Sequence, residues 1–223
     1  METESEFPPK RFAIIGFGGH GRVVAAALRA AGHRVVVATD HSPRDHRSKQ
    51  PFAILSDEDF LRKYRPQDVQ LVLGVGSVLP HETDSPSFRI VQKFHELGFE
   101  FVGLCHPAAW VAPDADIAST AQIHAGAVVQ PGAQIGEFTV VNTSASVDHD
   151  CVVGDFCHLA PGSTLSGEVS LGERSHIGTG ACIIQGTRIG EQCLVAAGAT
   201  VVQDIPSGIW VKGTPAKPYQ RKT

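Results

Sequence analysis

The densest group of polar side chains in this 223-residue sequence lies between Asn142 and Asp150. Within it, His149 is flanked by Asp148 and Asp150. An imidazole with its ordinary pKa near 6.5 is largely neutral at pH 7 and can accept a proton, and an adjacent carboxylate can fix its tautomer. The pattern suits a general base, although His149 could equally be a solvated surface side chain and Asn142 a structural amide.

Further histidines are spaced by eighteen residues. His176 follows His158 by eighteen residues, and His124 precedes Asn142 by the same number. We expect His158 to lie at a corner of the chain and His176 to stack on it as a neighbour rather than a reactant. We interpret His124 as an exposed residue at a corner of a coil.

The spacing of aliphatic residues indicates the element that carries these side chains. Every sixth residue from Val111 to Val201 is Val, Ile or Leu, sixteen times without a gap. Neither the 3.6-residue period of an α-helix nor the two-residue period of a strand produces a strict six. A chain that makes one side of a coil per hexad does, so the second half is predicted to be a β-helix.

Two further regularities set the cross-section and the length of each coil. The residue four places after each aliphatic is small except at Val169 and Ile205, as close packing in a narrow interior requires. About five coils stacked at about 4.8 Å would give a three-sided prism roughly 25 Å tall. Three hexads make one coil, because glycine–acid pairs recur every eighteen residues: Gly136-Glu137, Gly154-Asp155, Gly172-Glu173 and Gly190-Glu191.

The first hundred residues alternate predicted strands and helices, which is typical of a Rossmann-like α/β domain with a parallel sheet. The extended dipeptide His106-Pro107 marks the junction, so the predicted domains are residues 1–105 and 106–223. The expected strands are 11–15, 34–38, 69–75 and 99–104, and the expected helices are 22–31, 56–64 and 86–97.

A glycine-rich turn follows the first expected strand. Gly16, Gly18 and Gly21 fit G-x-G-x-x-G, and an acid, Asp40, follows the second strand. Such a turn lets a phosphate approach backbone N–H groups at a helix N-terminus. Gly18, Gly19, His20 and Asp40 are therefore candidates for binding a nucleotide or nucleotide sugar; a plain tight turn with a helix-capping histidine is the simpler alternative.

Composition excludes several classes of function. The net charge of −4 without a long basic run argues against nucleic-acid binding. No run of eighteen apolar residues could span a membrane, and the polar start lacks the apolar core of a signal peptide, so we expect a cytoplasmic protein. Cys151, Cys157 and Cys193 occupy small interior positions, and with no Cys-x-x-Cys pair we expect no metal site.

The second half resembles the hexapeptide acyltransferases in its unbroken hexads, in Asn142, in the run 148–151 and in His158-x-x-Pro161-Gly162. With the glycine-rich front domain, residues 10–217 are similar to the nucleotide-aminosugar N-acetyltransferases of the bacillosamine and perosamine pathways and to the related sialic acid O-acetyltransferases. The resemblance implies a left-handed parallel β-helix and a homotrimer with active sites between subunits. It also implies acetyl-coenzyme A (acetyl-CoA) as co-substrate and a nucleotide-aminosugar as acceptor.

The resemblance assigns roles to individual residues. His149 matches the general base of a direct acetyl transfer to the 4-amino group of a nucleotide-linked 4-amino-4,6-dideoxy sugar. Asp150 matches its neighbouring acid, and Asn142 lines the sugar site. The other matches are His158 near the acetyl thioester, Thr179 and Ala197 where backbone meets the coenzyme, and Gly18, Gly19, His20 and Asp40 in the nucleotide site.

Other functions stay open at this point. The acceptor could be a hydroxyl of sialic acid, and the base of the nucleotide could be uracil or guanine. A zinc carbonic anhydrase on the same fold would use three histidines, but the spacing of His149, His158 and His176 does not match that family. The β-helix could also only trimerise a binding protein or a nicotinamide enzyme.

Overall fold

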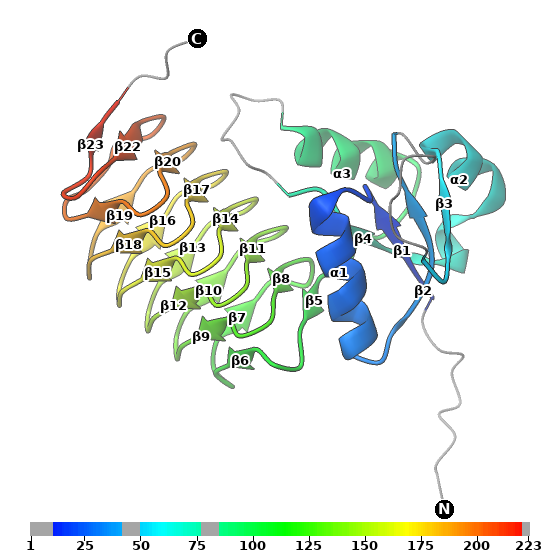
Figure 1. The fold of residues 1–223 in the computed structure, drawn as a ribbon, viewed down its shortest axis with the longest axis horizontal. Coiled ribbons are helices and arrows are strands. Elements are labelled where there is room, and N and C mark those ends of the chain that lie inside the picture. Colours follow the sequence, from blue (N-terminus) through cyan, green and yellow to red (C-terminus); the bar gives the residue numbers. More distant parts are fainter. Residues whose placement is uncertain (1–10, 42–49, 77–84, 220–223) are drawn as a thin grey trace, which may run out of the picture.

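The computed structural model describes residues 11–41, 50–76 and 85–219 and arranges them as two domains (Figure 1). The first is the predicted Rossmann-like α/β domain, and the second is the predicted left-handed parallel β-helix. Within the described ranges, no helix has the length and apolar character needed to cross a membrane.

The first domain is a doubly wound parallel sheet. Its strand order is β3-β2-β1-β4, so the chain reverses direction across the sheet between β1 and β4. In open α/β sheets, ligands bind at the carboxyl ends of the strands beside such a reversal. The strands are β1 (Arg11–Ile15), β2 (Arg34–Thr39), β3 (Ala53–Leu55) and β4 (Gln70–Leu73).

The side chains of β1 point alternately to the two faces of the sheet, and helices cover both faces. Phe12 and Ile14 pack in the apolar cluster that contains α1 (Gly19–Ala30). Ala13 and Ile15 pack in the other cluster, which includes residues of α2 (Asp57–Lys63) and α3 (Pro86–Glu96). A short 3-10 helix (Pro66–Asp68) precedes β4.

Two of the predicted helix ends are confirmed in detail. The Oγ of Ser56 accepts a hydrogen bond from the backbone N–H of Asp59 at 3.1 Å, which caps α2. Gly32 follows α1 with a φ of 78°, a conformation that favours glycine. The strand predicted at 99–104 is wrong: Phe101 makes an isolated bridge to Leu71, while β5 (Leu104–Cys105) pairs with β8 of the β-helix.

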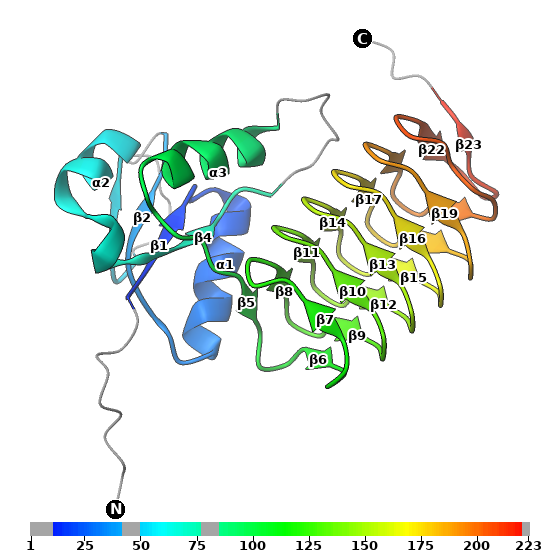
Figure 2. The same cartoon turned by 180° about the vertical axis from the view of Figure 1, so that it is seen from behind.

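The second domain stacks short parallel strands into three sheets, one for each side of the prism (Figures 1 and 2). Neighbours from β5 to β21 are eighteen residues apart, as in Val141↔Leu159 and Leu159↔Ile177, whereas the last two strands of the first side depart from this spacing and β23 is antiparallel to β22. The first side is β5-β8-β11-β14-β17-β20-β22-β23, with β8 (Gln122–Ile123), β11 (Val140–Val141), β14 (His158–Leu159), β17 (His176–Ile177), β20 (Leu194–Val195), β22 (Trp210–Lys212) and β23 (Lys217–Pro218).

The other two sides follow the same rule. The second consists of β6 (Trp110–Val111), β9 (Val128–Val129), β12 (Ser146–Val147), β15 (Thr164–Leu165), β18 (Cys182–Ile183) and β21 (Thr200–Val201). The third consists of β7 (Asp116–Ile117), β10 (Gln134–Ile135), β13 (Val152–Val153), β16 (Ser170–Leu171) and β19 (Arg188–Ile189).

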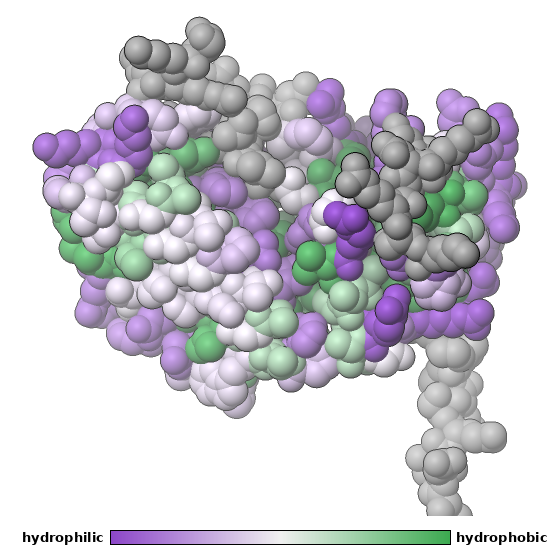
Figure 3. All heavy atoms as spheres, in the orientation of Figure 1, coloured by the Kyte–Doolittle hydropathy of each residue, from purple (hydrophilic) through white to green (hydrophobic). Residues whose placement is uncertain are grey.

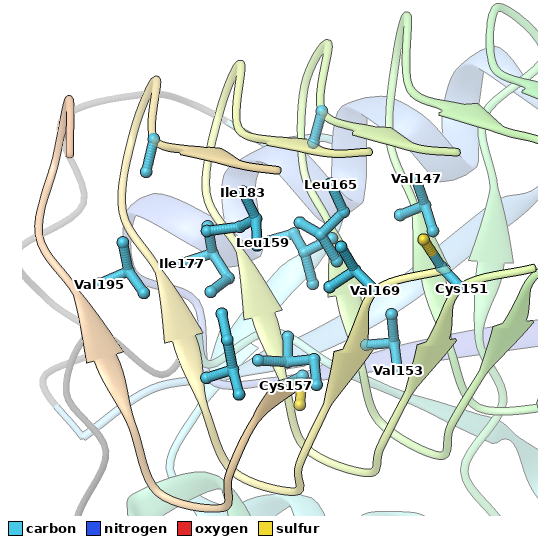
Figure 4. Packing of buried hydrophobic residues seen from close by; sticks show 14 of the residues in the cluster. Val147, Cys151, Val153, Cys157, Leu159, Leu165, Val169, Ile177, Ile183 and Val195 are labelled. Atoms are coloured by element: carbon cyan, nitrogen blue, oxygen red, sulfur yellow. The ribbon is translucent and has the colours of Figure 1, made fainter. Parts of the chain in front are cut away.

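The interior of the prism holds the two layers that the hexads predict. Leu159 and Ile177 are fully buried beside small side chains such as Cys157 (Figure 4). All three cysteines predicted at interior positions are buried and reduced. The outer surface in Figure 3 mixes polar and apolar residues.

Aromatic side chains join the two domains. Phe138 and Phe156, at corners of successive coils, stack with ring centroids 4.8 Å apart. Phe156 also contacts Phe88 of α3 at 5.5 Å, and Phe138 contacts Phe101 at 5.7 Å. These apolar contacts set the α/β domain against the early coils of the β-helix, and they bring the glycine-rich turn near the first side of the prism.

Candidate active site

The corner residues of successive coils stack into edges of the prism, and two edges carry the predicted site residues. The Asn142 edge, which follows the first side, contains Asn142, Thr143, Pro161, Thr179 and Ala197. The His149 edge, which follows the second side, contains Asp148, His149, Asp150 and Gly167. One whole side of the coil, carrying β12, separates Asn142 from His149 within the chain.

His149 and Asp150 form an exposed pair. The Nδ1 of His149 lies 2.9 Å from the Oδ2 of Asp150, and the His149 side chain is 46% exposed. A carboxylate can only accept, so Nδ1 carries a proton and Nε2 has a free lone pair in the neutral ring. The hydrogen bond to Asp150 raises the pKa of His149, with smaller contributions from Asp148 and Glu168. The arrangement is that of an oriented base open to a ligand.

Backbone conformation and a glycine hold this pair in place. Asp150 adopts a φ of 56°, which short polar residues tolerate better than most. The ring of His149 lies over Gly167 on the next coil: a Cβ built on Gly167 would come 2.4 Å from Nε2. Only glycine at this position leaves room for the imidazole as it stands.

A cavity of about 540 Å³ opens between the glycine-rich turn and the Asn142 edge. It is lined from the first domain by Gly18, Gly19 and His20, and from the β-helix by Asn142 and His158, among others. The Nδ2 of Asn142 lies 3.2 Å from the Nε2 of His158. Five predicted site residues from distant parts of the sequence therefore share one cavity.

Four histidines, three of them in α1, β14 and β17 and the fourth just after β8, meet beside this cavity. The ring centroid of His20 lies 5.3 Å from that of His124 and 6.3 Å from that of His158, which lies 5.0 Å from that of His176. The expected stacking of His176 on His158 is confirmed, but His158 lies in β14 rather than at a corner. The interpretation of His124 as exposed is wrong, because it is 1% exposed against His20.

A second cavity, of about 480 Å³, lies at the carboxyl ends of β1, β2 and β4. Gly18 and Asp40, two of the residues predicted to bind the nucleotide, line it together, and Lys93 lies at its wall. The glycines of the turn divide into two kinds. A Cβ at Gly16 or Gly21 would collide with protein atoms at 2.3 Å, whereas one at Gly18 would meet nothing within 4 Å.

The remaining predicted site residues, all within the described ranges, do not line either cavity. Thr179 and Ala197 are exposed on the Asn142 edge, one and two coils beyond Pro161, which lines the first cavity. His149 and Asp150 do not line either of the two cavities in the described part of the protomer. Among described residues, no group of three or more His, Cys, Asp or Glu side chains is arranged to hold a metal ion.

Comparisons with known proteins agree with both domains. The PglD N-terminal domain family matches residues 11–80. The acetyltransferase domain of PglB from Neisseria gonorrhoeae, solved in complex with acetyl coenzyme A, is 38% identical with a TM-score of 0.85. This alignment covers 95% of this chain and 100% of that one. The chain belongs to the PglD-related family of hexapeptide sugar acetyltransferases.

Another member of this acetyltransferase family was solved with both of its ligands. The GDP-perosamine N-acetyltransferase PerB from Caulobacter crescentus, in complex with CoA and GDP-perosamine, is 33% identical, with 97% of this chain and 100% of that chain covered and a TM-score of 0.84. WeeI from Acinetobacter baumannii shares the fold at 22% identity and a TM-score of 0.81. A search of curated proteins found no significant match.

Sequence reasoning missed two residues of this acetyltransferase. Gln122 bridges the domains beneath the first cavity, and Gly167 underlies His149. The eighteen-residue spacing contained a signal for both. Gln122 lies in the ladder that continues through Val140 to His158 and His176, and Gly167 follows His149 by one coil.

Proposed function

We propose that this protein transfers the acetyl group of acetyl-CoA directly to the 4-amino group of a nucleotide-linked 4-amino-4,6-dideoxy sugar. The observation that carries the proposal is the full-length agreement of both domains with PglB and PerB, at 38% and 33% identity. Neither domain alone would indicate both a nucleotide-linked acceptor and an acyl donor.

The proposed base is His149. The amine of the acceptor attacks the thioester carbonyl carbon, a C–N bond forms, and the C–S bond breaks. The attacking nitrogen gives its proton to Nε2 of His149, and the coenzyme leaves as a thiolate that takes up a proton. Since Asp150 holds the proton on Nδ1, Nε2 presents its lone pair to the amine. A positioned base of this kind contributes on the order of 10²–10⁴ in rate.

We assign the nucleotide and the sugar of the acceptor to different cavities. The nucleotide occupies the cavity at the carboxyl ends of β1, β2 and β4, where Asp40 and the Gly18 backbone line the wall. The sugar enters the neighbouring cavity with His20, Asn142 and His158. Gly18 borders both cavities, which suits a ligand that passes over an unobstructed glycine from one to the other.

The coenzyme is assigned to the Asn142 edge. Thr179 and Ala197 are exposed there, and Gly178 approaches Ala197 closely, since a Cβ at Gly178 would come 2.5 Å from the Ala197 nitrogen. A smooth edge of this kind gives an extended ligand access to backbone groups. His158, which lies in β14 and lines the cavity beside this edge, is placed to face the thioester.

The assembly we propose is a homotrimer with active sites between protomers. Within one protomer, His149 and the cavity with Asn142 lie on different edges of the prism. A cyclic trimer sets each edge against a neighbouring subunit. The His149 edge of one subunit can then complete the cavity of the next.

A thiol-release screen tests the proposed reaction. The protein is incubated with acetyl-CoA and, in turn, with UDP- and GDP-linked 4-amino-4,6-dideoxy sugars and sialic acid. We expect release of free CoA with an aminosugar nucleotide and a mass gain of one acetyl group on the acceptor. Turnover with sialic acid alone would assign O-acetylation instead, and no thiol release with any acceptor would contradict the proposal.

A further inference from the structure

The side chain of Gln122 spans the two domains beside the first cavity. Gln122 belongs to β8 and is 3% exposed. Its Nε2 donates to the backbone carbonyl of Leu73, at the end of β4, at 2.7 Å. Its Oε1 lies 3.0 Å from the Nε2 of His20, near the start of α1. One buried amide therefore connects the β-helix, the end of β4 and the glycine-rich turn.

This chain of hydrogen bonds determines which ring nitrogen of His20 carries the proton. A backbone carbonyl can only accept, so the Gln122 atom that faces Leu73 must be the NH₂ group. The atom facing His20 is then the amide oxygen, which can also only accept. His20 must therefore carry its proton on Nε2. Burial lowers the pKa of His20, with an opposing contribution from the Gln122 hydrogen bond, so the ring is neutral at pH 7.

The other ring nitrogen of His20, Nδ1, is not used by the bond to Gln122. In the neutral Nε2–H tautomer, Nδ1 has a lone pair and no proton. His20 lines the cavity with Asn142 and His158, and its side chain makes a hydrogen bond to Gln122 through Nε2. A neutral nitrogen acceptor in this place suits a hydroxyl or amine group of a ligand.

We propose that Gln122 is a positioning residue for the acceptor: it holds His20 as the Nε2–H tautomer, so that Nδ1 accepts a hydrogen bond from a hydroxyl or amine of the sugar. This inference rests on the proposed function for the identity of the ligand. Gln122 itself touches no substrate and acts through His20. The role also selects acceptors that present a donor group at this point.

The tautomer is measured directly by NMR, without any substrate. In protein labelled with ¹⁵N-histidine, the His20 signals are assigned by their loss in His20→Asn. We expect Nε2 to resonate as a protonated nitrogen and Nδ1 as an unprotonated one at pH 7.5. In Gln122→Met, which has similar size but no hydrogen bonds, the two tautomers should mix. An Nδ1-protonated His20 in the wild type would overturn the proposal, whatever the protein acetylates.

Kinetics test the consequence for the acceptor. Gln122→Met should lower kcat/KM for the acceptor about tenfold, as expected for one lost hydrogen bond, through a higher KM for the acceptor and with the KM for acetyl-CoA unchanged. The matched control is Gln134→Met, on the outer face of the third side, which should change neither constant. Equal rises of both KM values in Gln122→Met would indicate only a loosened domain junction and contradict the proposal.

Substitutions of His20 separate positioning from structure. An Asn at position 20 can place an amide oxygen near the position of Nδ1, whereas a Gln reaches toward that of Nε2, so His20→Asn should retain more acceptor affinity than His20→Gln. In the His20→Asn background, Gln122→Met should have little further effect on the acceptor KM, since residues that act as one unit are not additive. Full additivity would overturn the proposal.

A second variant guards against a folding defect in Gln122→Met. Gln122→Glu keeps the size of the side chain and an acceptor for Nε2–H, but it loses the N–H group that donates to Leu73. When the new carboxyl is ionised, its charge favours a His20 ring protonated on both nitrogens. Nδ1 then becomes a donor, so the acceptor KM should rise about tenfold here as well, with the NMR signal of a doubly protonated His20. An unchanged acceptor KM with a doubly protonated ring would contradict the role of Nδ1. A preparation that releases no thiol at all but shows the expected wild-type tautomer would instead refute the proposed function.

Discussion

At the scale of single residues, the proposed chemistry depends on how Asp150 orients and charges His149. The hydrogen bond from Nδ1 to the Asp150 carboxylate raises the pKa of the imidazole and fixes the lone pair on Nε2. A base with a raised pKa is stronger, but it becomes protonated, and so inactive, at a higher pH. The pH–rate profile therefore reports on this pair.

Replacing Asp150 by Asn should move the acid limb of the kcat/KM profile to lower pH. The amide carries no charge, so the raised pKa of His149 falls back toward its ordinary value, and the neutral form persists to a lower pH. The plateau rate should fall, because Nε2 is then a weaker and less well oriented base. The measurement is initial rate against pH at low acceptor concentration. The control is Asp148→Asn, whose charge contributes less to the pKa of His149.

An acid limb that stays in place in Asp150→Asn would show that another group is titrating. A larger shift in Asp148→Asn than in Asp150→Asn would mean that the hydrogen-bonded carboxylate is not the dominant influence.

Replacing Gly167 by Ala should displace the imidazole and leave the fold intact. The new Cβ would lie 2.4 Å from Nε2 of His149, but the ring is the far end of an exposed side chain and can rotate away. We expect kcat to fall at least tenfold, since a base must lie within hydrogen-bond reach of its proton. The melting temperature should change little. Gln185→Ala, on the same edge one coil further on, is the control and should retain wild-type kcat.

At the scale of elements, the hexad repeat predicts the strands of the β-helix far more completely than the sequence of the first domain predicts its strands and helices. Each coil contacts only its neighbours, so the aliphatic and small positions at Leu159 and Cys157 appear directly as a sequence period. The strand β3 (Ala53–Leu55) has no such period and was not predicted. Residues 99–104 have the composition of a strand, yet Leu104 pairs with Gln122 because the chain leaves the first domain there.

The site divides in the same way. His149, Asp150 and Asn142 stand out as a polar cluster in the sequence, and the structure adds their neighbours. The sequence could not show that Gln122 faces Leu73 and His20, because those contacts depend on how the two domains dock. The same docking buries His124, which its spacing alone suggested to be exposed.

The burial of His124 at this junction should make stability depend on pH. Desolvation, with the nearby His20 and His106, lowers the pKa of His124 from 6.5 to about 3. Between pH 6.5 and about 3, His124 is protonated in the unfolded chain but not in the folded chain, so the free energy of unfolding decreases as the pH falls. The loss is at most about 1.4 kcal/mol per pH unit from this group.

His124→Leu should therefore flatten the decline in stability between pH 6.5 and 4.5. Neither ring nitrogen of His124 has a hydrogen-bond partner among described residues, so the substitution should not destabilise the protein at pH 8. The measurement is urea unfolding at a series of pH values. A variant that loses stability as steeply as the wild type over this range would show that His124 is not the group responsible.

At the scale of the whole molecule, the two halves of the proposed site lie on different edges of the prism. The cavity with Asn142 and His158 receives its first wall from the glycine-rich turn of the same chain, while His149 lies one side of the coil away. The central claim is therefore that a complete site needs two protomers. A closed trimer with three equivalent interfaces satisfies this requirement.

Complementation between inactive variants tests this claim most directly. His149→Ala and Asn142→Ala are each assayed alone, then co-expressed in equal amounts so that the proposed trimers contain both variants, and thiol release is measured per protomer. Half of the protomers supply an intact His149 and half an intact Asn142, so we predict recovery of about a quarter of wild-type activity. Mixed trimers no more active than the separate variants would place both residues in one protomer's site and contradict the account.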